Sequence, residues 1–232
     1  MQVLKLNEEH IASLERFGVF LNRQPNAFSN AQAILSETAS VKLFSEIQTL
    51  TGAPTDAVAA SIYMRRHGFF IAGMLHMLSK FNLLFTGKLE EVSLFIENGT
   101  IQFSIPPDSF DEVRDRHEAI SSVLGVYGHP VIEYLSKRAH ISKLILWENV
   151  WGYVLWMYSM LLNEDCTYAQ GDLDYLLEDE TWKPHMRRSP FKQYLQNEEA
   201  LAAMANYKRT TCCLLKELPD TEKCPYCPLN RT

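Results

Sequence analysis

The cysteines of this chain are gathered near its C-terminal end, and they constrain its fold and chemistry more than any other feature. Four of the five lie within the last 21 of 232 residues: Cys212, Cys213, Cys224 and Cys227. The fifth, Cys166, stands alone. An odd cysteine count, with a start that lacks a basic region followed by an apolar core, argues against an exported disulfide framework. We therefore expect the four terminal thiols to bind a metal ion or a metal cluster.

The spacing Cys-Cys-x10-Cys-x2-Cys leaves the identity of the metal open. Cys224 and Cys227 form a Cys-x2-Cys knuckle of the kind that wraps around zinc. Cys212 and Cys213 are adjacent, and neighbouring side chains diverge in an extended chain, so both reach one small ion only if the backbone bends. A [2Fe–2S] cluster is a wider target for soft thiolates. These residues favour a cluster, with zinc and a redox-active dithiol as the alternatives.

The rest of the chain predicts an α+β fold that is predominantly helical, with one β-hairpin and the cysteine-rich tail. Asn98 and Gly99 separate two alternating runs, which predicts a hairpin over about residues 91–105 because both turn residues tolerate positive φ. We expect residues 1–205 to form a helix-rich scaffold and residues 206–232 to pack on it. Apolar spacing predicts helical or buried segments over residues 8–21, 43–50, 57–85, 109–126, 131–162 and 190–204, with a break near 125–130.

Residues 144–162 are nearly all apolar, so a membrane span has to be considered. Glu148 lies inside this run, and a carboxylate is costly to place within a bilayer. We therefore predict a buried helix within a folded domain rather than a membrane span. A buried carboxylate needs a partner, and a nearby arginine is the simplest candidate.

Charge is unevenly distributed. The chain has 22 basic and 28 acidic residues and a net charge of −6, which argues against a non-specific nucleic-acid binder because such proteins need a surplus of basic residues to neutralise phosphates. Residues 163–180 contain seven acids and no base, whereas residues 181–192 contain four bases and no acid. Ser189 and Pro190 predict the start of a helix just after this basic stretch.

The segment from Arg209 to Leu229, with its Arg-Thr-Thr-Cys-Cys start and its Cys-Pro-Tyr-Cys-Pro-Leu end, resembles the terminal motif of the FhuF family of ferric-siderophore reductases. The Trp147-Glu148-Asn149 element is also similar to a Trp-x-Asn element of that family. The resemblance implies a [2Fe–2S] cluster held by Cys212, Cys213, Cys224 and Cys227, and one-electron reduction of Fe(III) in a ferric siderophore. The competing interpretation is a non-enzymatic binding protein with a structural zinc tail.

The resemblance also implies partners and a location. The substrate would be a ferric siderophore, the electron donor is not identified by the sequence, and we expect a cytoplasmic protein that can associate peripherally with the inner face of the membrane near siderophore transporters. Many ferric siderophores are anionic, and arginines hold such ligands well. The substrate-binding candidates are Arg187, Arg188 and Lys192, from the basic stretch that precedes the last helix, and Arg209, which lies just before the first cysteines.

Overall fold

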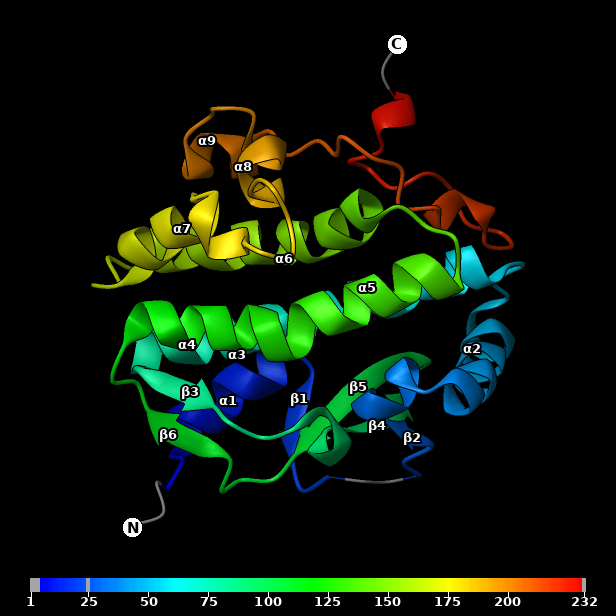
Figure 1. The fold of residues 1–232 in the computed structure, drawn as a ribbon, viewed down its shortest axis with the longest axis horizontal. Coiled ribbons are helices and arrows are strands. Elements are labelled where there is room, and N and C mark those ends of the chain that lie inside the picture. The colour runs from blue at the N-terminus through cyan, green and yellow to red at the C-terminus, as the bar shows by residue number, and fades with distance from the viewer. Residues whose placement is uncertain (1–4, 24–25, 231–232) are drawn as a thin grey trace.

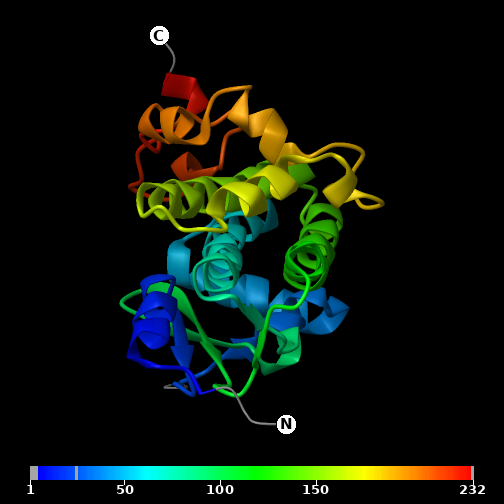
Figure 2. The same cartoon turned by 90° about the vertical axis from the view of Figure 1, so that its left-hand side faces the viewer.

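The computed structural model describes residues 5–23 and 26–230. Two long helices, α3 (Asp56–Phe81) and α6 (Lys143–Asn163), pack against each other through the middle of the protein (Figures 1 and 2). The strands and α1 (Glu8–Arg16) lie on the side of α3 away from α6. The other face of α6 is covered by three shorter helices: α7 (Ala169–Leu177), α8 (Pro190–Leu195) and α9 (Ala200–Ala205). The expected mainly helical α+β class is confirmed.

Helix α3 is buried along most of its length because it lies between the sheet and α6. It begins where the Thr55 hydroxyl accepts a hydrogen bond from the Val58 N–H, and it ends at Asn82, whose φ of 59° closes the helix. A Cβ on Gly68 would lie 2.8 Å from the Cα of Val150, so α3 and α6 approach closely at this glycine. The predicted burial of residues 57–85 is correct, although the last three form strand β3 (Leu83–Phe85).

The predicted hairpin is present as β4 (Ser93–Glu97) and β5 (Thr100–Ile105). Asn98 and Gly99 have φ values of 51° and 69°, as their turn requires. The expectation of a hairpin alone was wrong, because further short strands extend the sheet to the order β1-β5-β4-β2 and form a separate β3–β6 pair. The additional strands are β1 (Val19–Leu21), β2 (Ser29–Asn30) and β6 (Phe110–Glu112).

Two segments differ from the helix predictions at glycine and proline residues. Helix α1 ends at Arg16, and Gly18 with φ 70° turns the chain into β1, so Leu21 lies in a strand. Between α4 (Arg116–Val123) and α5 (His129–Arg138) a π-helical segment, Leu124–Gly128, keeps the helix continuous where a break was predicted. The break falls instead at residues 139–142, before α6 begins.

Helix α2 (Glu37–Thr51) ends at Gly52 in the left-handed conformation. Ser189 caps α8, as predicted, but positive φ at Gln196 and Asn197 separates α8 from α9, so residues 190–204 form two helices. In α6, Trp147 and Trp151 are buried in the core. Within the described residues, no helix combines the length and the apolar character needed to cross a membrane.

Candidate functional site

The C-terminal segment after α9 is held against α6 by Glu148, whose side chain is fully buried. Its Oε1 accepts hydrogen bonds from the backbone N–H and the hydroxyl of Thr210, and its Oε2 accepts from the same two groups of Thr211. The Arg209 Nη2 lies 3.5 Å from Oε2. The arginine partner predicted for Glu148 is therefore correct. One helical carboxylate binds the three residues that precede Cys212.

A second anchor holds the backbone of Cys213. The Ser61 hydroxyl, on α3, donates to the Cys213 carbonyl oxygen at 2.7 Å. Asn149, next to Glu148 on α6, donates from Nδ2 to both the carbonyl oxygen and the hydroxyl of Ser61. Because these contacts are buried, they specify where the adjacent cysteines lie relative to the two central helices.

Three of the four thiols form a small buried cluster of their own: Cys213, Cys224 and Cys227. The Sγ atoms of Cys213 and Cys224 are 3.9 Å apart. The Cys227 N–H donates to the Cys224 carbonyl oxygen, which closes the knuckle turn. Cys212 is half-buried. Cys213, from the adjacent pair, thus lies together with the two cysteines of the knuckle. Among the described residues, no three histidine, cysteine or acidic side chains are already arranged to hold a metal ion.

The surroundings of the thiols are cationic. Burial opposes ionisation of Cys213, but the backbone N–H of Leu215 and the guanidinium groups of Arg209 and Arg65 outweigh it and lower the pKa of the thiol. The Arg65 Nη1 lies 3.7 Å from the Cys213 Sγ. Burial and the neighbouring Cys213 raise the pKa of Cys224 to about 11. The two guanidinium groups therefore favour the thiolate form of Cys213, which is the form that binds metals.

Lys216, at the surface, is a further cationic neighbour of the thiols. Its pKa is raised mainly by Glu217, and the nearby sulfurs of Cys212 and Cys227 raise it further. The sulfurs of this group therefore have two arginines, Arg65 and Arg209, and a surface lysine, Lys216, as cationic neighbours. Four thiols with cationic neighbours suit a soft metal centre of net negative charge, so the donor set fits both a [2Fe–2S] cluster and zinc.

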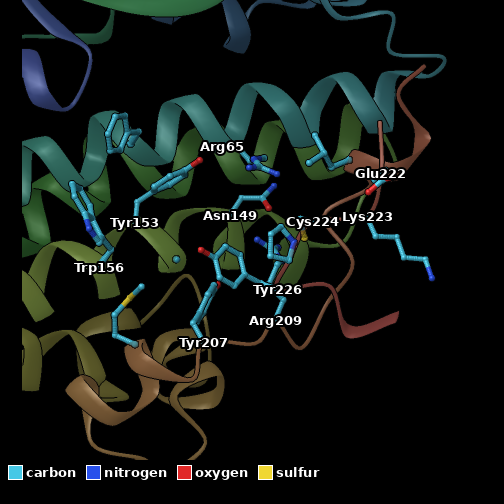
Figure 3. Close-up of a pocket in the computed structure, with 15 residues that line it drawn as sticks. Arg65, Asn149, Tyr153, Trp156, Tyr207, Arg209, Glu222, Lys223, Cys224 and Tyr226 are labelled. Carbon is cyan, nitrogen blue, oxygen red and sulfur yellow. The ribbon is translucent and has the colours of Figure 1, made fainter. Parts of the chain in front are cut away.

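A cavity of about 560 Å³ opens beside the thiols, between α3, α6, α9 and the tail (Figure 3). Cys224 is part of its wall. Five aromatic side chains also line it: Phe69, Tyr153, Trp156, Tyr207 and Tyr226. Its polar lining includes Arg65, Asn149 and Arg209. The cavity and the candidate metal centre therefore share a cysteine.

The predicted substrate residues are not brought together. Arg209 lines the cavity, but it is buried and paired with Glu148. Arg187, Arg188 and Lys192 are exposed on the segment that leads into α8 and on α8 itself, and none lines the cavity. Within the described part of the chain, no ion pair joins these three side chains to a carboxylate.

Arg65, Ser61 and Asn149 are parts of this site that were not predicted from the sequence. Each lies on a central helix far from the cysteines in sequence, and nothing in the local pattern links it to them. Arg65 gave one usable signal, since it is a cation within a long apolar segment. Asn149 belongs to the Trp147-Glu148-Asn149 element, so that element contributes two anchors of the tail.

The fold and the site define an α+β protein in which two central helices support a C-terminal group of four thiols beside an aromatic cavity. No protein-family model matches the chain, and no curated protein matches it either.

Proposed function

We propose that this protein is a ferric-siderophore reductase whose Cys212, Cys213, Cys224 and Cys227 hold a [2Fe–2S] cluster. Such a cluster would supply one electron at a time, which matches the reduction of Fe(III) to Fe(II). The observation that carries the proposal is the position of Cys224, which belongs to the thiol group and also lines the cavity. A ligand in the cavity would lie directly beside the proposed centre.

The residues around the thiols have distinct tasks in this proposal. Glu148 holds the loop that presents Cys212 and Cys213, through its contacts with Thr210 and Thr211. Arg65 and Arg209 favour the thiolate form of Cys213. The aromatic walls exclude water and bind the organic part of the chelate. Hard oxygen donors prefer the ferric ion, so reduction weakens its binding and releases iron without cleavage of the siderophore.

Purification under low oxygen tests the metal assignment. We expect brown protein with about two iron atoms per chain and visible absorption that dithionite bleaches. Cys213→Ser removes a proposed ligand and should abolish or strongly reduce that absorption, whereas Cys166→Ser should leave it intact because Cys166 contacts Ser79 away from the thiol group. An unchanged spectrum in Cys213→Ser would remove this residue from the ligand set.

The alternative is a non-enzymatic binding protein with a structural zinc ion on the same four cysteines. The closed Cys224–Cys227 turn supports it, because knuckles of this kind are common zinc ligands. It predicts colourless protein with a single zinc per chain. An electron carrier that serves another protein is separated by mixing the reduced protein with ferric chelates alone, since only a reductase is oxidised by them directly.

The remaining parts of the proposal follow from this reaction. The protein would act in the cytoplasm on a ferric siderophore, receive electrons from a separate donor, and associate peripherally with the membrane face where siderophores enter. The net charge of −6 gives no support for nucleic-acid binding.

A further inference from the structure

We propose that the cavity beside Cys224 binds a planar, negatively charged aromatic ring of the catecholate type, presented as one arm of a ferric siderophore. This inference rests on the proposed function, and it specifies the substrate class. Three independent features of the cavity support it: its aromatic walls, an arginine without a carboxylate partner, and a buried hydrogen-bond acceptor without a donor.

The aromatic walls come from two parts of the chain. Phe69 lies on α3, and Tyr153 and Trp156 lie on α6, with the Phe69 and Tyr153 ring centroids 5.0 Å apart. Tyr207 and Tyr226, with centroids 5.2 Å apart, come from the C-terminal segment. Figure 3 shows the α6 rings beside the helices and the other two beside the tail. Walls of this kind favour a flat aromatic ligand, which stacks on the rings or meets their edges.

Arg65 provides the positive charge. No carboxylate lies within ion-pair distance of its guanidinium among the described residues, in contrast to Arg209, which Glu148 neutralises. One of its five N–H groups points to the Cys213 Sγ, and Arg65 also shares a side-chain hydrogen bond with Tyr153. The remaining N–H groups can bind an anionic oxygen, so Arg65 lies where it can contact the ligand and the Cys213 sulfur together.

Asn149 provides the unsatisfied acceptor. Its side chain is 1% exposed, and Nδ2 is occupied by Ser61, but Oδ1 has no hydrogen-bond partner within the described residues. The Tyr207 hydroxyl, also at the cavity, is buried without a partner. Buried polar atoms are normally paired, so this cavity calls for a ligand with an N–H or O–H donor. Catecholamide arms carry an amide N–H next to the ring.

These features separate the common chelate classes. A tris-hydroxamate complex is neutral and aliphatic, so it uses neither Arg65 nor ring stacking. A citrate-based complex is anionic but offers no aromatic ring. A catecholate arm meets the charge of Arg65, the rings of Tyr153 and Trp156, and the Asn149 acceptor at once.

The test is binding of gallium(III) chelates to the intact protein. Gallium(III) has the charge of Fe(III) but is not reduced, so the result does not depend on electron transfer. The chain has four tryptophans, and Trp156 lines the cavity whereas the other three are at most 1% exposed in the core. Quenching of tryptophan fluorescence therefore reports occupancy, and Trp156→Leu should remove most of the signal.

We expect a gallium catecholate to bind at least about tenfold more tightly than a gallium hydroxamate or a citrate-based complex. Measured by calorimetry, Arg65→Gln should weaken catecholate binding by about tenfold or more and Trp156→Leu by about fivefold. Lys42→Gln, which removes an exposed charge on α2, should change nothing. Because Arg65 also contacts Cys213, the Trp156 variant keeps the test valid if Arg65→Gln disturbs the tail.

Several results would overturn the proposal. The first is hydroxamate binding that equals or exceeds catecholate binding, and the second is binding of flavin mononucleotide in place of the catecholate. The third is the absence of binding by any chelate. The fourth is a loss of catecholate affinity in an Arg187→Gln/Arg188→Gln variant that Arg65→Gln does not show. Iron content and dithionite bleaching are measured on the same samples. Normal iron with no catecholate binding refutes this inference alone, whereas colourless protein refutes the proposed function.

Discussion

Replacing Glu148 with glutamine tests the anchor of the cysteine segment. The change preserves side-chain size, but it removes the charge that faces Arg209 and turns an amide donor toward the N–H and O–H donors of Thr210 or Thr211. Glu148 is fully buried and Arg209 is 7% exposed. Loss of one partner from a buried ion pair costs about 3–5 kcal/mol because the remaining charge is unpaired. We expect Glu148→Gln to lower the free energy of urea unfolding by that amount.

The same loss should appear locally. Native-state hydrogen exchange is the sharper assay, because it detects local opening of the tail that leaves the central helices folded. The amides of Thr210 and Thr211 donate directly to the Glu148 carboxylate. A loss of about 3 kcal/mol corresponds to more than a hundredfold faster exchange of these two amides.

The matched control is Glu133→Gln. Glu133 pairs with Lys143, but their side chains are 30% and 38% exposed, and exposed pairs contribute about 0.2–1 kcal/mol. Adding Arg209→Met to Glu148→Gln should restore part of the stability, because it removes the unpaired charge. If Glu148→Gln costs less than about 1 kcal/mol and both amides keep their protection, the reasoning about this anchor is wrong.

Three further predictions concern the scaffold. Gly68→Ala should destabilise the fold by about 1–3 kcal/mol in urea unfolding, because its Cβ would meet backbone atoms of α6, whereas Gly171→Ala, with no atom within 4 Å of its Cβ, should not destabilise it. Gly99→Ala should cost about 1 kcal/mol, because its φ of 69° strains any residue with a Cβ; no change in the thermal midpoint would contradict this. Burial lowers the pKa of His67 from 6.5 to about 4. Between these two pH values the imidazole is protonated in the unfolded chain but neutral in the folded protein. Stability from this residue is complete above pH 6.5 and should fall by about 2 kcal/mol at pH 5, as urea unfolding at both pH values would show.

The sequence predicted those elements whose signals are local. Asn98 and Gly99 specified the hairpin because a two-residue turn depends on its own φ values. Ser189 marked a helix start because a capping side chain bonds within its own first turn. Strands such as β2, with two residues, had no pattern to detect, since they exist only through pairing with β4.

Glycine and proline near residues 125–130 misled the prediction for a related reason. These residues weaken a helix in isolation, yet packing keeps this one continuous through a π-helical turn. His140, with φ 51°, lies where the chain does turn before α6, and no glycine or proline marks that position. Tertiary contacts decided both outcomes.

By itself, the sequence determined which metal-binding groups are present, namely four thiols at a defined spacing. It also determined that a carboxylate within an apolar helix needs a partner. Only the tertiary structure decided that the partner is the arginine next to those thiols, that Arg65 contacts Cys213, and that Cys224 opens onto an aromatic cavity. Residue types and short spacings can be read directly from the sequence. The contacts of Glu148 with Arg209 and Thr210 join residues more than sixty positions apart. They depend on how the helices pack, which no local pattern encodes.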